Sequence, residues 1–184
     1  MHAAGGGVGS AAVQLAAAAG AHVIGVVGAG AAKAQAAKEA GAQVVIDRTT
    51  TPDLAAAVRE ATAGHGADLV IDPVGGDAYD ASTKCIALDG RIMVIGFAGG
   101  RQQEVRAAHA LVKSYGVIGV HWGLYVQRRP QAVHAAHTKI LALVESGVVR
   151  PVVADVLPYA QAPQALECLA SGAVVGRLAV AVAS

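Results

Sequence analysis

The chain has 184 residues, of which 54% are hydrophobic and 15% are charged. This length is enough for one folded domain, and the composition excludes a disordered chain. The 14 basic and 13 acidic side chains give a formal charge of +1 without a basic stripe, so no nucleic-acid partner is expected. There is no apolar run of transmembrane length and no secretory signal, and Cys85 and Cys168 are too far apart to indicate a disulfide framework. We therefore expect a cytoplasmic protein without a membrane partner.

Short β-branched runs alternate with longer alanine-rich stretches along the chain. The apolar runs predict strands at residues 22–27, 43–46, 67–72, 91–97, 116–122, 152–156 and 176–182. The stretches between them predict helices at residues 10–20, 31–40, 51–64, 77–88, 104–112, 130–146 and 162–171. Strands that are apolar on both faces and alternate with helices indicate a parallel sheet covered on both sides. We expect a doubly wound α/β fold of the Rossmann type.

A glycine-rich loop from Ala4 to Gly9 precedes the first predicted helix. Its pattern, A-x-G-x-x-G, is typical of loops whose backbone approaches a pyrophosphate at a helix N-terminus. In this reading Gly6 permits the close approach and Gly9 permits close packing of the helix on the strand. The alternative is a helix cap in a chain rich in alanine and glycine.

Only three residues precede Ala4, whereas a typical strand has about five or six residues. The first strand of a Rossmann sheet is central, so we expect it to be truncated here. The chain would then be a fragment, an engineered piece or the product of a misassigned start codon.

The end of the second Rossmann strand distinguishes the two nicotinamide cofactors. An NAD site places an acidic residue there for the ribose 2′-hydroxyl, but residues 25–30 contain none. Lys33 and Arg48 follow, and two cations without a carboxylate suit a 2′-phosphate. NADPH is therefore favoured over NADH, unless both cations are ordinary surface charges.

Neither a metal site nor a catalytic set is visible in the sequence. His134 and His137 are three residues apart on one predicted helix, but they have no carboxylate or cysteine companion, so no metal is expected. Cys85 and Cys168 are interpreted as small core residues. No Ser/His/Asp set has a recognisable context, and no catalytic residue is assigned.

Several segments in order resemble the quinone oxidoreductase (zeta-crystallin-like) branch of the medium-chain dehydrogenase/reductase family. They read HAAGGGVGSAAVQLA, AKEAGAQVVIDR, GADLVIDPVGGDAYDAS, GRIMVIGFAGG, VIGVHWG and ESGVVRPVV, followed by LPYAQAPQALECLASGAVVGRLAV. The resemblance implies a zinc-independent enzyme that passes a hydride from NADPH to a quinone or an α,β-unsaturated carbonyl. It also implies an N-terminal GroES-like domain that is absent here, a Rossmann domain at residues 1–129, and a segment at 130–184 that returns to the absent domain. The chain alone is expected to be inactive.

The resemblance also implies which residues contact the cofactor. Those expected under the pyrophosphate are Gly6, Gly7 and Val8. Those expected around the adenosine ribose and its phosphate are Gly28, Lys33 and Arg48, although the family often has Tyr or His at the position of Arg48. Gly76 is expected near the adenine-side ribose or the pyrophosphate. The residues expected to flank the nicotinamide through their backbone are Gly96, Phe97, Ala98, Val120, His121 and Trp122.

Three other functions remain open at this point. An enoyl reductase of the same superfamily differs mainly in the absent substrate domain, and a non-catalytic NADPH-binding module would need no substrate. A Rossmann-like methyltransferase is disfavoured because it also expects an acid at the end of the second strand. The edge strand Gly116–Val120 is apolar, and the resemblance implies that it pairs across a two-fold axis in a homodimer.

Overall fold

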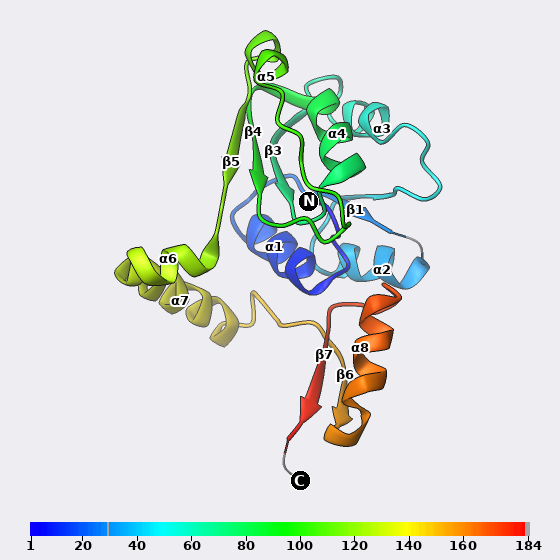
Figure 1. Ribbon diagram of the computed structural model, residues 1–184, viewed down its shortest axis with the longest axis vertical. Coiled ribbons are helices and arrows are strands. Elements are labelled where there is room, and N and C mark those ends of the chain that lie inside the picture. Colours follow the sequence, from blue (N-terminus) through cyan, green and yellow to red (C-terminus); the bar gives the residue numbers. More distant parts are fainter. Residues whose placement is uncertain (29, 183–184) are drawn as a thin grey trace. The chain divides into compact units, whose positions relative to one another are not determined.

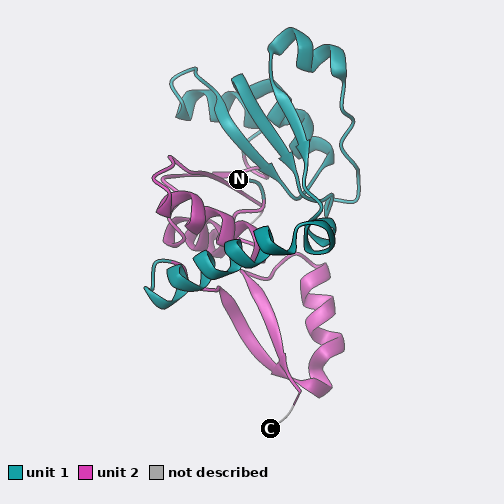
Figure 2. Ribbon diagram, turned by 90° about the vertical axis from the view of Figure 1, so that its left-hand side faces the viewer, with its two compact units in different colours: residues 1–2, 51–148 teal, residues 3–50, 149–184 magenta. Residues whose placement is uncertain are grey.

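The computed structural model describes residues 1–28 and 30–182. Ala29, in the stretch without an acid, and residues 183–184, at the end of the C-terminal segment, lie outside the described residues. The chain divides into unit 1, Met1–His2 with Thr51–Val148, and unit 2, Ala3–Thr50 with Val149–Ser184 (Figure 2). Among the described residues, no helix has the length and hydrophobicity needed to cross a bilayer.

Unit 2 joins the start of the chain to its end. Its N-terminal elements are α1 (Gly7–Ala18), β1 (Ile24–Val27), α2 (Ala31–Glu39) and β2 (Val44–Asp47). Its C-terminal elements are β6 (Val153–Pro158), the 3-10 turn η1 (Tyr159–Gln161), α8 (Ala162–Ala170) and β7 (Arg177–Ala181). The pairs β1–β2 and β6–β7 are both parallel, and Figure 1 shows α8 running alongside β6 and β7.

Unit 1 is a three-stranded parallel sheet with helices. Its elements are α3 (Leu54–Ala61), β3 (Ala67–Asp72), α4 (Gly76–Cys85), β4 (Ile86–Val94), α5 (Ala107–Lys113), β5 (Gly116–Gly119), α6 (Trp122–Arg128) and α7 (Pro130–Glu145). The strand order is β3-β4-β5, which leaves β5 at an edge. Four buried side chains form a hydrophobic cluster in this unit: Val70, Tyr79, Ile92 and Tyr115.

The strand orders confirm the expected α/β fold. Taken separately, β2-β1 and β3-β4-β5 match the two halves of the Rossmann order 3-2-1-4-5-6 on either side of its first strand. No strand precedes α1 in the described residues. The first residues still make strand-like hydrogen bonds. In unit 1 the His2 N–H donates to the Ile71 carbonyl (3.2 Å), and in unit 2 the Ala4 N–H donates to the Val26 carbonyl (2.9 Å).

Several sequence-based boundaries differ from the structure. The helix expected at 77–88 ends at Cys85, because Ile86 already has extended backbone and pairs with Ala67 of β3. Asp89, expected in the turn that closes this helix, lies within β4 with a φ of 57°. The strand expected at 91–97 ends at Val94.

A helix was also missed. The strand expected at 116–122 stops at Gly119, and α6 begins at Trp122. The run GVIGVHW has no polar side chain before His121, so its periodicity does not separate the strand from the first residues of the helix. The helix expected at 104–112 occupies 107–113. The two units divide at 50/51 and 148/149, and the domain boundary expected at 129/130 stays a prediction.

Candidate functional site

The glycine loop leads directly into α1. Gly6 is the N-cap residue, and its carbonyl accepts the Ser10 N–H at 2.8 Å. No side chain caps this end of the helix, and no acidic residue lies in its first turn. The first N–H groups of a helix have no acceptor within it, and the helix dipole adds positive potential there. This end of α1 is therefore suited to an anion.

Gly6 and Gly9 are small for different reasons. A Cβ on Gly9 would collide with the Ala3 carbonyl oxygen and would lie 2.8 Å from the Ala4 Cα, so the packing of the loop itself requires glycine. A Cβ on Gly6 would approach only the Ala3 carbonyl oxygen, at 3.3 Å, and the φ of Gly6 is an ordinary −90°. Packing within the protein therefore does not require glycine at position 6. The missing side chain leaves space for a ligand close to the backbone.

The ends of β1 and β2 place Arg48 beside Gly28. The Arg48 N–H donates to the Val27 carbonyl at 3.1 Å. The Nη2 and Nε atoms of its guanidinium group lie 3.9 Å and 4.0 Å from where a Cβ on Gly28 would stand. Apart from the chain neighbours of Gly28, no other described residue has an atom within 4 Å of that position. Arg48 is exposed. Gly28 therefore faces open space that is bordered by a cation.

Lys33 is partly buried and hydrogen-bonded, unlike a lysine that extends freely into solvent. It is half-buried in α2, and its backbone packs against Gly5, where a Cβ would be 3.0 Å from the Lys33 carbonyl oxygen. Its ammonium donates a hydrogen bond to the Gly172 carbonyl, in the turn between α8 and β7. Two N–H bonds of the ammonium are left to donate to a ligand, but the third holds the turn between α8 and β7.

The structure adds Arg177, which the sequence analysis missed. Its side chain lies against Gly7: a Cβ on Gly7 would be 2.5 Å from the Arg177 Cγ and 2.9 Å from its Nε. The neighbouring Gly176 N–H donates to the Gly5 carbonyl at 2.8 Å. The two positions are 170 residues apart, and no local pattern could have predicted that they meet.

In unit 1, Asp72 organises the ends of β3 and β4. This fully buried carboxylate accepts the N–H groups of Val74 (2.8 Å) and Gly75 (2.9 Å), which lead into α4 at Gly76. It also accepts the Gln103 amide at 2.9 Å, and the same amide donates to the Gly96 carbonyl at 2.8 Å. Asp72 was not singled out from the sequence, although an acid at the end of an apolar strand is a usable signal.

The six residues expected near the nicotinamide follow two neighbouring strands, β4 and β5, of the unit 1 sheet. The loop after β4 carries Gly96, Phe97 and Ala98, and the Ala98 N–H donates to the Pro73 carbonyl at 2.9 Å. After β5, the Val120 N–H donates to the Val94 carbonyl at 2.9 Å, and His121 is the N-cap residue of α6. The structure thus brings these two loops to the same edge of the sheet.

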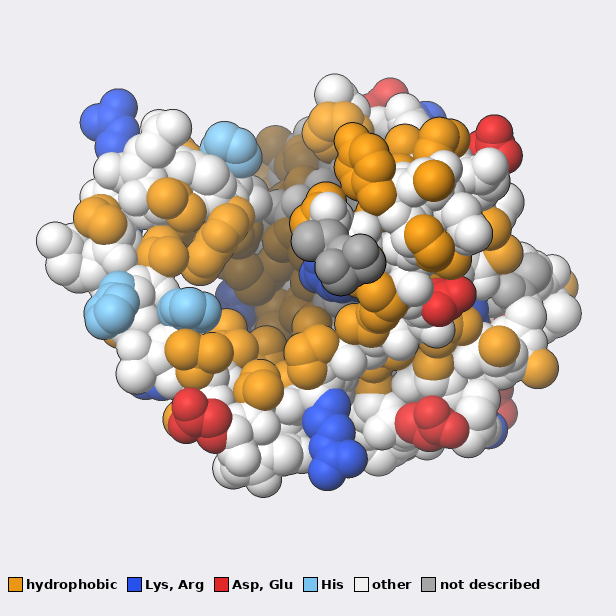
Figure 3. All heavy atoms as spheres, turned by 90° about the horizontal axis from the view of Figure 1, so that it is seen from below, with side chains coloured by type: hydrophobic (Ala, Val, Ile, Leu, Met, Phe, Trp, Pro, Cys, Tyr) orange, Lys and Arg blue, Asp and Glu red, His pale blue; other side chains and the backbone are white. Residues whose placement is uncertain are grey.

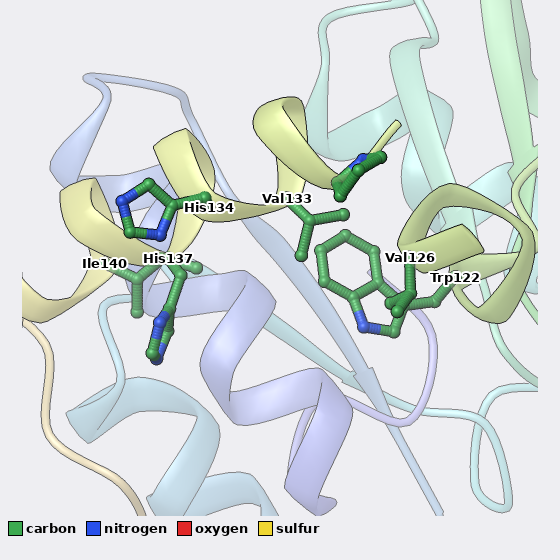
Figure 4. Close-up of a pocket in the computed structure, with 7 residues that line it drawn as sticks. Trp122, Val126, Val133, His134, His137 and Ile140 are labelled. Carbon is green, nitrogen blue, oxygen red and sulfur yellow. The ribbon is translucent and has the colours of Figure 1, made fainter. Parts of the chain in front are cut away.

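Trp122 opens onto an apolar groove between α6 and α7 with a volume of about 390 Å³. The residues that line it are Trp122, Val126, Pro130, Val133, His134, His137 and Ile140. Figure 4 shows the indole next to Val133, with His134 and His137 further along α7. Histidines also stand among hydrophobic side chains on the face seen in Figure 3.

Within residues 1–28 and 30–182, no group of three or more His, Cys, Asp or Glu side chains could hold a metal ion. Cys85 is buried, and burial raises the pKa of its thiol, whereas Cys168 is exposed rather than in a core as expected. Burial, followed by the neighbouring Tyr115, raises the pKa of Tyr79 to about 12.

Comparison with known proteins identifies relatives along most of the chain. The sequence profile of the zinc-binding dehydrogenase family matches residues 7–138. A quinone oxidoreductase-like protein 2 homolog from Nematostella vectensis is 36% identical over 146 residues, which are 79% of this chain and 39% of that protein. Highly-reducing polyketide synthase 1 from Aureobasidium melanogenum is 30% identical over 186 residues, covering 98% of this chain and 8% of that protein.

A solved structure extends the similarity to three dimensions. The Escherichia coli quinone oxidoreductase complexed with NADPH has a TM-score of 0.86 and 35% identity, and the match covers 97% of this chain and 55% of that one. The chain therefore spans only about half, or less, of the length of these relatives.

Proposed function

This chain belongs to the zinc-binding dehydrogenase family, and we propose that it forms the NADPH-binding part of an oxidoreductase that reduces a quinone or an α,β-unsaturated carbonyl. The observation that carries the proposal is the glycine loop at the N-terminus of α1. This helix end has neither a side-chain cap nor an acid, and the space over Gly6 is open. An unneutralised helix N-terminus beside a backbone that a ligand can approach favours a pyrophosphate.

The 2′-phosphate on the adenosine ribose, which only NADPH has, is the basis for preferring NADPH over NADH. Arg48 borders the open space at Gly28, where the absence of a side chain leaves room for a ribose. Asp47, at the end of β2, accepts hydrogen bonds from the Thr49 N–H (2.8 Å) and hydroxyl (2.6 Å), which lower the pKa of its carboxyl. Asp47 ends β2, which matches the third Rossmann strand, whereas an NAD site needs its carboxylate at the end of the second strand.

A bound nicotinamide cofactor supplies the hydride, while the protein binds and orients the cofactor and excludes water. We assign the phosphate contacts to unit 2 and the backbone contacts to the nicotinamide to the loops after β4 and β5 in unit 1. No catalytic side chain is assigned.

Two observations support this substrate class: the α6–α7 groove is apolar, and quinone oxidoreductases are among the proteins similar to this chain. An indole and aliphatic side chains favour a flat apolar compound, and imidazoles beside them offer donors to a carbonyl oxygen. An enoyl reductase is the second candidate, and the similarity to a highly-reducing polyketide synthase favours it.

A homodimer through the β5 edge is part of the proposal. β5 is the last strand of its sheet, and Ile118 is 43% exposed there. An apolar edge strand with unpaired backbone groups favours pairing with a second copy. Substitution of Ile118 by lysine is expected to shift the chain to a monomer in sedimentation equilibrium, and an unchanged mass would contradict this interface.

Calorimetric titration of the chain with NADPH and with NADH tests the cofactor proposal. We expect at least about tenfold tighter binding of NADPH, a difference of about 1.4 kcal/mol. Arg48→Gln should remove most of this preference, whereas Arg106→Gln, at an exposed position in unit 1, should leave it unchanged. Equal affinities of the unmodified chain for both nucleotides would refute the role of Arg48.

A further inference from the structure

A second pocket in unit 1 shares no residue with the expected cofactor contacts. It has a volume of about 280 Å³ and is lined by residues of α4, of α5 and of the segments that flank α5. Three aromatic side chains line it: Tyr79, His109 and Tyr115. Pockets for drug-sized ligands have about 300–1,000 Å³, so this pocket suits a single ring rather than a dinucleotide.

One buried polar group in this pocket has no partner. Tyr79 is 1% exposed and packs in the hydrophobic cluster with Val70, Ile92 and Tyr115. Among the described residues, its hydroxyl forms no hydrogen bond. Burial, followed by the nearby Tyr115, raises the pKa of Tyr79, but the two hydroxyls do not meet hydrogen-bond geometry. Because an unpaired buried hydroxyl is unfavourable, a ligand oxygen that reaches Tyr79 would be stabilised there.

The Tyr115 hydroxyl is held by a different partner. It lies 3.1 Å from the His109 Nδ1, and the two rings meet edge to face with their centroids 5.7 Å apart. This contact leaves the Tyr79 hydroxyl to be paired by a ligand. A ligand hydroxyl can both donate and accept a hydrogen bond, so it suits Tyr79 whichever way the hydrogen bond between Tyr115 and His109 runs.

The charges around the pocket favour a neutral ligand. Two basic side chains, Lys84 and Arg106, and two acidic ones, Asp80 and Glu104, line it, so neither sign is in excess. A charged ligand group beside Tyr79 would also lose its hydration among apolar side chains. Lys84, Glu104 and Arg106 are exposed, and exposed side chains change rotamer rapidly, so they can move aside when a ligand enters.

We propose that this pocket binds a small neutral phenol, whose hydroxyl pairs with the Tyr79 hydroxyl and whose ring packs against Tyr115 and His109. Aromatic rings attract one another in edge-to-face and offset arrangements, which favours a planar ring over an aliphatic alcohol. The site goes beyond the proposed function and does not depend on it, because a chain that binds no dinucleotide would still have this pocket.

The test is a titration of the whole chain, isotopically labelled in its four tyrosine rings, with p-cresol, followed by NMR. The signals of Tyr79 and Tyr115 should shift saturably, and those of Tyr125 and Tyr159 should not. Toluene, which lacks the hydroxyl, should bind about tenfold more weakly, the loss expected for one hydrogen bond. Tyr79→Phe should weaken p-cresol by a similar factor and remove its advantage over toluene, whereas Tyr159→Phe, at an exposed position, should change neither affinity.

A second variant leaves Tyr79 intact. Thr83→Leu puts a larger apolar side chain into the wall of the pocket and should weaken p-cresol and toluene alike. Thermal unfolding checks that each variant is folded. If Tyr79→Phe does not fold, Thr83→Leu and the comparison of p-cresol with toluene on the unmodified chain decide.

Three results would overturn the inference. If no tyrosine signal shifts up to millimolar p-cresol, the Tyr79 hydroxyl is paired by water only. Equal affinities of the unmodified chain for p-cresol and toluene would show that the ligand hydroxyl makes no hydrogen bond in the pocket. Quenching of Trp122 fluorescence without shifts of Tyr79 and Tyr115 would place the phenol in the α6–α7 groove instead.

Discussion

Of two glycines in the same loop, one should lose stability and the other should lose ligand affinity when a single methyl group is added. In Gly9→Ala the new Cβ meets backbone atoms of Ala3 and Ala4, which cannot move independently of the loop. Overpacking of this kind costs about 1–3 kcal/mol, and the better helix propensity of alanine returns up to about 1 kcal/mol. We expect Gly9→Ala to lower the free energy of unfolding by about 1–2 kcal/mol, or the Tm by roughly 2–8 °C.

Gly6→Ala should leave stability nearly unchanged. Its Cβ requires a shift of only a few tenths of an ångström from the Ala3 carbonyl oxygen. Alanine is a slightly poorer N-cap than glycine, but it also restricts the unfolded chain, and the two effects are each about 0.5 kcal/mol and oppose each other. The added methyl group would stand between the backbone and the proposed pyrophosphate, so NADPH affinity should fall at least about tenfold.

Urea denaturation followed by circular dichroism measures the first effect, and calorimetric titration with NADPH measures the second. The unmodified chain is the reference in both assays. If Gly6→Ala unfolds as early as Gly9→Ala, the steric distinction between the two positions is wrong. If Gly6→Ala remains folded and binds NADPH normally, the ligand does not approach the loop at Gly6.

Three further predictions follow from buried or isolated groups. The pKa of Tyr79 is raised from 10.0 to about 12, so the stabilisation from its neutral hydroxyl is complete below pH 10. The free energy of unfolding should then fall by about 2–3 kcal/mol as the pH rises toward 12. Tyr79→Phe should remove this alkaline loss and Tyr159→Phe, at an exposed position, should not; identical pH profiles of the two variants would contradict the assignment. Asp72→Ala removes the acceptor of the Val74 and Gly75 N–H groups and one of the two acceptors of the Gln103 amide. It should lower the free energy of unfolding by about 3 kcal/mol or more, whereas Asp68→Ala, at an exposed position, should change it little; equal urea midpoints would refute the role of Asp72. Trp122 is the only tryptophan, so 1,4-naphthoquinone should quench the chain's fluorescence saturably, and quenching as linear as that of a free indole would argue against binding in the α6–α7 groove.

The sequence alone determined the alternation of strands and helices, the glycine loop and the family resemblance. Strand and helix periodicities are local properties of the sequence, so the fold class was predicted correctly. The family resemblance was confirmed by the match to the family profile. Boundaries were predicted wrongly where local signals were ambiguous. The run from Gly116 to Val120 has no polar residue and continues the strand pattern toward α6, and Ile86 pairs with β3 instead of extending its helix.

Only the tertiary structure decided which groups lie beside the loop in unit 2 and which groups surround Asp72 in unit 1. It placed Arg177 over Gly7, gave the Lys33 ammonium a carbonyl partner, and buried Asp72 among three donors. Such neighbours cannot be predicted from spacing, because parallel strand pairing and backbone hydrogen bonds bring together residues that are far apart in the chain. The sequence therefore determined that a glycine-rich loop leads into a helix, and the packing of β7 against that loop decided which charges lie beside it.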